Sequence, residues 1–504
     1  MIRFRLHPHG FRKRLMLSLR FVLFSSALLL TAACGVSSES VADAANSDIS
    51  TLDAEASIDA AETTDVQAEE DTSVPPSADT TSPEQKPEIA PEPSDEVAFI
   101  YDQDVLRSFE LVLTTENMAK LDSDPAAEEY VPGTLIYDGV EYPNVGVRYK
   151  GSAGAWINCV EGSTPSNLWN FTGKRTCPKL SLKVSFNKYD PEGRFFGVKK
   201  LLFHAMNNDP SQMRERLGYW LFRKMGVAAP RVVHAKVTIN GDRVGLYANV
   251  EYIDGRFTRS RFEDGKGNLY KEVWPTWNEI TGQLTEERLL AGLRTNEDED
   301  PSVQKVLDFS GSMLGNSQTR AETLASWMRL PYVARFIAVD RTIAADDGPF
   351  HYYCNPQGCS NHNFYMYEEA EDDLLWLIPW DLDNAFVVLD DTFKTPADYF
   401  LKVVYPWNDL TVPCQAHPGS ADWTPWQMPA VCDPLFRTYA EHYGDEYQAA
   451  VDELLAGPFS PEVVEEQLAT WSAQIEDTVA EVSALDPEQL TEGAWDSGLT
   501  DLKA

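Results

Sequence analysis

Residues 376–386 read WLIPWDLDNAF, an apolar run interrupted by Asp381 and Asp383. The apolar residues predict a buried strand, and a carboxylate that leaves water beside such a strand is unstable unless a cation meets it. Because residues at i and i+2 of an extended chain face the same side, both carboxylates are able to meet one positively charged partner. The segment therefore predicts either such a partner at a strand end or a pair of hydrated acids in the turn after Trp380.

Several segments before this one predict strands. They are SFELVLT (108–114), VGVRYKG (145–151), KLSLKVSF (179–186) and AKVTINGDRVGLYANVEY (235–252). The last contains Asn240-Gly241, a dipeptide typical of hairpin turns. A second strand pair is predicted near the two aspartates, in NFYMYE (363–368) and DLLWLIPW (373–380). The first half of the folded part is therefore expected to be rich in β-strands.

One helix interrupts the predicted strands, and more follow them. In DPSQMRERLGYWLFRKMG (209–226) Asp209 or Ser211 is a suitable cap, apolar residues recur at helical spacing, and Gly226 ends the pattern. After residue 280 the chain is expected to be mainly helical, including an amphipathic helix whose stripe is Val464, Leu468, Trp471, Ile475 and Val479. The expected fold class is α+β, with the final acidic residues forming a loose tail.

The N-terminus has the composition of a bacterial export signal. Six basic residues precede the short apolar stretch FVLFSSALLLTAA, which ends at Cys34. The stretch is too short to span a bilayer, and the pattern resembles a lipoprotein signal with Cys34 as the lipidated first residue of the mature chain. Residues 1–33 are therefore predicted to be a signal peptide and the protein to be lipid-anchored at the cell envelope. An ordinary signal peptide followed by an unmodified thiol is the alternative.

Residues 34–97 predict an extended tether. From residue 35 to 97 there are 17 Asp or Glu against the single Lys86, with few aromatic side chains. Such a segment buries too little apolar surface to offset its chain entropy, and its charges repel. The tether carries a large part of the net charge of −37. The acidic balance argues against nucleic acid as a partner.

Six cysteines follow Cys34 and fall into three local pairs. They are Cys159 with Cys177, Cys354 with Cys359, and Cys414 with Cys432. In an exported protein an even number of cysteines indicates disulfides, and local pairs are the simplest connectivity. Zinc binding is the alternative, although no CxxC occurs.

The ordered segments resemble the spore coat protein H (CotH) kinase family. They are VRYKGSAGAW, KLSLKVSF, FHAMNNDPSQMRERLGYWLFRKMG, VTINGDRVGLYANVEYID, GNLYK, HNFYMYE and IPWDLDNAF. The resemblance covers roughly residues 98–480 and implies an atypical, two-lobed protein-kinase-like fold, with an N-lobe at 98–260, a C-lobe at 261–480 and an acidic tail at 481–504. It also implies transfer of the γ-phosphate of ATP, with Mg²⁺ or Mn²⁺, to hydroxyl groups of exported or cell-surface proteins.

The resemblance implies roles for the acidic segments. Asp381, Asp383 and Asn363 match the metal-binding residues, and Asp347 matches the aspartate that orients the attacking hydroxyl, with Asp346 close behind. The chain departs from the family by placing PFHYYCNPQGCS between that aspartate and Asn363. A helix-terminal turn is the alternative for Asp346 and Asp347, and His351 and His362 are taken as ordinary loop residues.

The resemblance implies nucleotide contacts in the strand-rich part. The expected nucleotide-binding residues are Lys150, Gly151, Ser152, Gly154, Lys183 and Glu251. Residues 150–154 would bring backbone N–H groups to phosphates. Lys183 alternates with apolar neighbours on its strand and would pair with Glu215, as the ATP-phosphate lysine and helix acid of kinases do. Glu251 would lie near adenine. A ligand-free hairpin turn and a surface ion pair are the alternatives.

Two other functions fit the sequence. A catalytically silent, kinase-like envelope protein would use the same fold as a binding or adhesion module, since ATP is scarce outside the cytoplasm. A hydrolase would use two of the acids on opposite sides of a scissile bond. Nothing in the sequence indicates the oligomeric state.

Overall fold

The computed structural model describes residues 95–163, 171–276, 284–299, 301–355, 358–387, 403, 405–416 and 426–503. The predicted signal peptide, Cys34 and residues 34–94 of the tether lie outside these ranges. The last tether residues belong to the fold instead, because Val97 is fully buried and Asp95 pairs with Arg231. Within the described residues, no helix has both the length and the apolar composition needed to cross a membrane.

Seven strands close into a barrel in the order β1-β2-β3-β4-β5-β7-β6. They are β1 (Arg107–Val112), β2 (Val131–Tyr137), β3 (Val140–Tyr149), β4 (Leu182–Ser185), β5 (Lys200–His204), β6 (Val232–Ile239) and β7 (Arg243–Val250). β1 and β6 pair in parallel, and the other neighbours are antiparallel. Asn240 and Gly241 connect β6 to β7 at φ 54° and 78°, as the predicted hairpin requires. The sequence pattern did not predict β2 or β5, and it did not predict that the barrel closes.

Short elements accompany the barrel strands. They are α1 (Thr115–Ser123), η1 (Pro125–Ala127) and α2 (Ala153–Trp156). The barrel core is apolar and includes Leu182 and Val184 of β4. Lys183 lies between them in sequence and so faces away from this core, as the alternation in β4 predicted.

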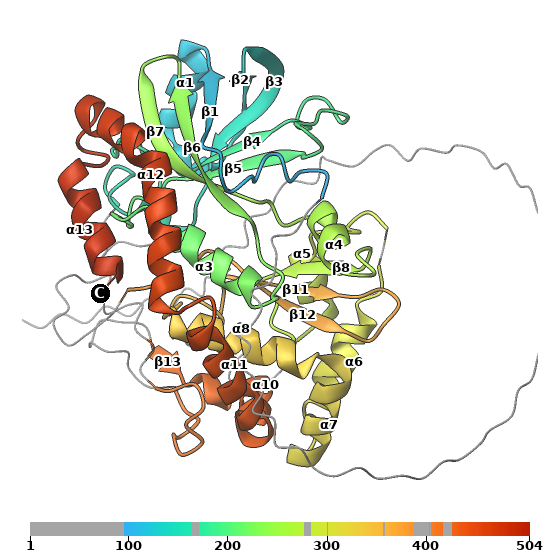
Figure 1. The fold of residues 1–504 in the computed structure, drawn as a ribbon. Helices are drawn as coiled ribbons and strands as arrows, with labels where there is room; N and C mark the ends of the chain where they lie inside the picture. The colour runs from blue at the N-terminus through green and yellow to red at the C-terminus, as the bar shows by residue number, and fades with distance from the viewer. Residues whose placement is uncertain are drawn as a thin grey trace, which may run out of the picture. The chain divides into compact units, whose positions relative to one another are not determined.

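Helix α3 (Arg214–Lys224) lies between the barrel and the helical part, where it packs on both β6 and α8 (Leu330–Thr342) (Figure 1). It starts later than predicted, although the side chain of Asp209 still accepts a hydrogen bond from the N–H of Arg214 at 2.8 Å. Gly226 follows the helix at φ 72°, the left-handed conformation that ends a helix most readily in glycine.

The second half of the chain is mainly helical, as predicted. Its remaining helices are α4 (Gly255–Arg261), α5 (Glu286–Gly292), α6 (Gln304–Ser312), α7 (Ser317–Trp327), α10 (Pro434–His442), α11 (Gly444–Ala456), α12 (Pro461–Leu485) and α13 (Glu492–Lys503), with η2 (Ala430–Cys432). Two small sheets accompany them, β12-β11-β8 and β10-β9-β13. Their strands are β8 (Asn268–Lys271), β9 (Tyr352–Asn355), β10 (Gly358–Ser360), β11 (Phe364–Glu368), β12 (Leu375–Pro379) and β13 (Trp426–Met428). The α+β class is confirmed, and the predicted β11–β12 pair is present.

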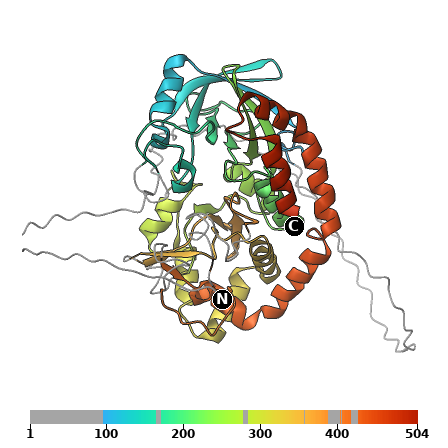
Figure 2. The same cartoon turned by 90° about the vertical axis from the view of Figure 1, so that its left-hand side faces the viewer.

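Helix α12 runs from the helical part to the barrel, where it packs on β7 (Figure 2). Four of the five predicted stripe residues are buried, and Val464 is partly buried. The expectation of a loose acidic tail was wrong, because Trp495 and Leu499 of α13 are buried in the core. Apolar side chains at helical spacing within the acidic sequence explain the difference.

The three predicted disulfides are confirmed. Cys159 pairs with Cys177, Cys354 with Cys359, and Cys414 with Cys432. The Cys354–Cys359 bond joins β9 to β10 within the segment that separates Asp347 from Asn363. The departure from the family spacing is therefore a stapled hairpin.

Candidate functional site

The loop after β12 brings Asp381 beside helix α3. The N–H of Asp381 donates a hydrogen bond to the hydroxyl oxygen of Tyr219, at 2.8 Å. Gly218 permits this approach, because a Cβ there would lie only 3.0 Å from Leu382. Asp381 has φ 57°, a strained conformation for a residue other than glycine. The loop thus holds one predicted metal ligand in a fixed, unusual backbone conformation.

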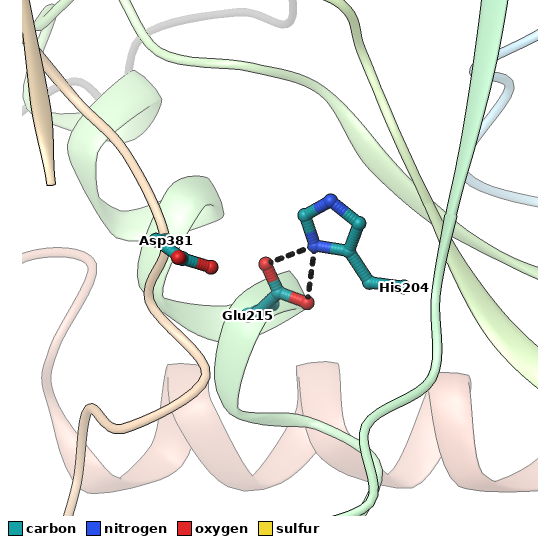
Figure 3. A group of neighbouring side chains, drawn as sticks. All are labelled: His204, Glu215 and Asp381. Atoms are coloured by element: carbon teal, nitrogen blue, oxygen red, sulfur yellow. Dashed lines mark hydrogen bonds and ion pairs between the residues drawn. The ribbon is translucent and has the colours of Figure 1, made fainter. Parts of the chain in front are cut away.

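His204, Glu215 and Asp381 converge from three different elements (Figure 3). Each offers a ligand atom, and these atoms lie within 4.8 Å of one another. Nδ1 of His204, at the end of β5, lies 2.8 and 3.0 Å from the two carboxylate oxygens of Glu215 at the start of α3. On the other side of the imidazole, Nε2 lies 2.8 Å from Nζ of Lys150, which directly follows β3.

Burial and like charges work against the ionised acids of this group. Burial and the charges of Asp381 and Asp209 raise the pKa of Glu215 well above its usual range, and the charge of Lys150 opposes the shift. Burial and the charges of Asp381, Glu215 and Asp347 raise the pKa of Asp383 in the same way. Burial also lowers the pKa of Lys150. Added positive charge would therefore stabilise the ionised carboxylates.

Asp347 is held by the hairpin that carries the Cys354–Cys359 disulfide. Its Oδ1 accepts a hydrogen bond from the Tyr353 hydroxyl at 2.5 Å and lies 2.9 Å from Nε2 of His362. Its Oδ2 lies 3.3 Å from the amide nitrogen of Asn363 and 3.4 Å from that of Asn384. Burial raises the pKa of Asp347, but His362 and Tyr353 outweigh it and lower the pKa below its usual value.

Asp346 has a different environment from its neighbour. Arg341 donates to its carboxylate at 2.9 Å, and Arg341 also pairs with the buried Asp340. This ion-pair group ties the end of α8 to the following turn. The turn therefore presents the carboxylate of Asp347 to the site, while that of Asp346 is used in the scaffold.

One pocket brings together three of the predicted residues of the second half of the chain. Asp347, Asn363 and Asp381 line it, beside Asn384, which was not predicted. Asn363 donates its amide N–H to the carbonyl of Asp347 at 2.7 Å, so its side-chain oxygen is the atom suited to a cation. Asp383 belongs to the same electrostatic group, since the charges of Asp381 and Asp347 both raise its pKa.

The segment 150–154 is oriented by a carboxylate. Gly151 donates its N–H to Glu128 at 3.0 Å, and Glu128 also pairs with Arg148. Gly151 itself is required sterically, because a Cβ there would lie 2.4 Å from that of Ala155. The N–H of Gly151, which was expected to donate to a phosphate, therefore donates to a carboxylate. Ser152 and Gly154 flank the short helix α2.

Glu251, expected near adenine, lies instead in a buried ion-pair group. It accepts hydrogen bonds from Arg231, Arg256 and Arg261 at 2.7 to 3.0 Å, and the same three arginines contact Asp95. Burial raises the pKa of Glu251, but the charges of Arg261 and Arg231 outweigh it and hold the pKa far below its usual range. These contacts give Glu251 a structural role.

A comparison with protein-family models gives a match over most of the chain. The model of the CotH kinase protein family matches residues 147–503. The chain belongs to the CotH kinase protein family. The match includes α13, beyond the end of the resemblance found in the sequence.

Two curated relatives carry spore-coat names. Inner spore coat protein H of Bacillus subtilis (strain 168) is 26% identical over 218 residues, which are 42% of this chain and 56% of that protein. The inner spore coat protein H-like protein of the same organism is 35% identical over 80 residues, which are 16% of this chain and 24% of that protein. The chain thus spans about half of the first relative and a quarter of the second.

The lysine beside Glu215 in this CotH family member is Lys150. Its charge opposes the raised pKa of Glu215, and both contact His204. Lys183 lies over the ring of Tyr252 instead, 5.1 Å from its centroid. The sequence correctly predicted that Lys183 faces away from the barrel core. However, the lysine near Glu215 of α3 is Lys150, which directly follows β3.

Several residues of the site were missed in the sequence. His204 is the last residue of the strand KLLFH (200–204), and its role depends on contacts that cross the barrel end. His362 was taken as an ordinary loop residue, and the sequence did not indicate its contact with Asp347. Asn384 stands directly after Asp383, so its place in the sequence was a usable signal. Tyr353 could be found only once the hairpin was known.

Proposed function

We propose that this CotH family member is an atypical protein kinase that transfers the γ-phosphate of ATP to hydroxyl groups of exported or cell-surface proteins. The observation that carries the proposal is the excess of carboxylates over cations where helix α3 meets the loop after β12. Ligand atoms of Glu215 and Asp381 lie within 4.8 Å of each other, the charges of both raise the pKa of Asp383, and the charge of Lys150 opposes the raised pKa values of Glu215 and Asp383. Such a site fits a divalent cation, Mg²⁺ or Mn²⁺, brought by a nucleotide.

Each residue has a role that its contacts support. Asp381, Asp383 and the side-chain oxygen of Asn363 would hold the metal, which neutralises phosphate oxygens when bound. Lys150 would orient the phosphates, and Glu215 would orient Lys150 through His204. Because its pKa is lowered, Asp347 is ionised at neutral pH and is able to accept a hydrogen bond from an attacking hydroxyl. Oδ2 is the better candidate atom, since Tyr353 and His362 contact Oδ1 at 2.5 and 2.9 Å, whereas the amides beside Oδ2 are more distant, at 3.3 and 3.4 Å.

The test measures binding and transfer separately in the full chain. ATP with Mg²⁺ or Mn²⁺ should raise the unfolding midpoint, because a ligand that binds the folded state stabilises it. Label from [γ-³²P]ATP should enter protein. Asp347→Asn should keep the metal-dependent stabilisation and lose the transfer.

Asp346→Asn is the matched control. Its carboxylate pairs with Arg341, so transfer should persist in this variant. No stabilisation at saturating nucleotide and either metal would contradict the proposal. The alternative, a silent binding module of the envelope, takes support from the spore-coat names of the relatives and predicts that result.

The predicted lipid anchor at Cys34 would place this activity at the cell envelope. It rests on the sequence pattern of residues 1–34. Radiolabelled palmitate incorporation into the full chain, and its loss in Cys34→Ser, would test the anchor independently of kinase activity.

A further inference from the structure

The geometry points to His204 as a positioning residue: a neutral imidazole, protonated on Nδ1, that connects the Lys150 ammonium to the Glu215 carboxylate. In the proposed kinase the lysine and the helix acid would therefore act through a histidine bridge instead of a direct ion pair. The bridge itself does not depend on kinase activity. Its catalytic consequence rests on the proposed function.

The chemistry of the two neighbours sets the tautomer. A lysine ammonium is a donor without an acceptor, so Nε2 of His204, 2.8 Å from Nζ of Lys150, must accept. A neutral imidazole carries one N–H, so Nδ1 then holds the proton and donates it to an oxygen of Glu215, 2.8 and 3.0 Å away, which accepts whether or not the carboxyl group is ionised. A neutral imidazole with its proton on Nδ1 satisfies both contacts.

The surroundings favour a neutral ring. His204 is 4% exposed, and burial and the charge of Lys150 lower its pKa well below the usual value. The Trp380 ring packs edge-on against it, with the centroids 5.8 Å apart, and Lys150 lies 5.9 Å from the Trp380 centroid. The imidazole is thus clamped by an aromatic ring and by two hydrogen-bonding partners, a contact set that fixes its orientation.

The bridge joins three separate parts of the fold. Lys150 follows β3, His204 ends β5 and Glu215 lies in the first turn of α3. A movement of α3 relative to the barrel would break one of the two contacts. His204 therefore makes the position of Lys150 depend on the position of α3, although it touches neither substrate nor metal in this assignment.

The first test reads the tautomer directly in the full chain without nucleotide. Histidine labelled with ¹⁵N distinguishes a protonated ring nitrogen from a bare one in ¹H–¹⁵N spectra. The His204 signals are assigned by their absence in His204→Gln. A proton on Nδ1, with Nε2 bare, is expected; a proton on Nε2 would overturn the inference. Displacement of the Nδ1 proton by added Mg²⁺ would also overturn it, because the ring would then be a metal ligand.

The second test compares two variants by kinetics. His204→Gln retains an amide oxygen for Lys150 and an amide N–H for Glu215, whereas His204→Leu fills similar space with neither. The Leu variant should lose about tenfold or more in kcat/KM for ATP, and the Gln variant should recover most of it. Equal losses in both, with equal unfolding midpoints, would overturn the positioning role.

The two tests separate this inference from the proposed function. If the tautomer is as expected but the wild-type chain neither binds ATP nor transfers phosphate, the bridge stands and the proposed function fails. If the chain is an active kinase with the proton on Nε2, the proposed function stands and the bridge fails.

Discussion

Two buried groups of charged residues lie in the same fold and are compensated in opposite ways. The arginine cluster consists of Arg231, Arg256 and Arg261 around Glu251 and Asp95. The carboxylate group consists of the buried Glu215 and the half-buried Asp381 and Asp383, with Lys150 and His204. Positive charge exceeds negative in the first, and negative exceeds positive in the second.

The pKa directions follow this difference. The charges of Arg261 and Arg231 overcome burial and lower the pKa of Glu251, whereas burial and neighbouring acids raise those of Glu215 and Asp383. A buried acid with its own arginines is complete within the protein. A buried acid among other acids is stabilised by a partner from outside, which is the property expected of a cation site.

The largest effect is expected from breaking the arginine cluster. Glu251→Gln leaves three buried arginines with Asp95 as their acidic partner and should lower the free energy of unfolding by about 3–5 kcal/mol. Urea denaturation measures this loss. Glu481→Gln, at the more exposed pair with Lys236, is the matched control and should cost less than about 1 kcal/mol. A similar small loss for both would show that the cluster is not structural.

Asp381→Asn should have the opposite effect on the stability of the metal-free protein. Removing one of several repelling carboxylates should leave the metal-free protein as stable as the wild type or more so. At ATP and metal concentrations near 100 times Kd, the wild type should gain about 2.7 kcal/mol that the variant lacks. Thermal unfolding with and without ligand measures both quantities. An equal ligand response in the two proteins would place the metal elsewhere.

The pH dependence of stability should differ in sign between the two groups. A raised pKa means that folded Asp383 binds more protons than unfolded Asp383, so its contribution to stability falls as pH rises from about 3.9 through the folded pKa. The lowered pKa of Glu251 adds stability above the unfolded pKa, and this is lost as pH falls through the folded pKa.

Asp383→Asn should therefore remove a decline of at most about 1.4 kcal/mol per pH unit. Urea denaturation of the metal-free protein at a series of pH values, beside the wild type, measures the slope. Saturating Mg²⁺ should flatten the wild-type profile in the same way, because a cation stabilises the ionised form. Identical slopes in the variant and the metal-free wild type would contradict the assignment.

Local sequence patterns predicted the strands and helices that carry the site better than they predicted which side chains contact one another there. Alternation and turn residues located β3, β4, the β6–β7 hairpin and the β11–β12 pair, and helical spacing located α3. The acids of 376–386 were visible because charge at the end of an apolar strand is unusual in any sequence. The roles of Asp346 and Asp347 separate only in the structure, where Asp346 pairs with Arg341 and Asp347 accepts a hydrogen bond from the stapled hairpin.

The closure of the barrel determines which of the missed residues meet at the site. Lys150 and His204 stand at the ends of strands β3 and β5, and β4 lies between those strands. Which strand ends meet α3 depends on pairings across the barrel, and no local pattern in the sequence encodes them. The ion pairs of Glu251 were missed for a related reason, because Arg231 directly precedes β6 and the other two arginines lie in α4.

The smallest effect is expected at residues 150–154, where an acid that pairs with an arginine contacts a segment predicted to bind phosphate. Glu128 pairs with Arg148 and accepts the N–H of Gly151, so its charge lies where a phosphate was predicted. Glu128→Gln keeps an acceptor and removes the charge, and should raise ATP affinity about threefold to tenfold, or about 1 kcal/mol. Glu129→Gln, at the exposed pair with Lys120, is the neighbouring control and should leave affinity unchanged. Titration with ATP at fixed Mg²⁺ measures both. A weaker affinity in Glu128→Gln would mean that Glu128 orients the segment for the nucleotide instead of competing with it.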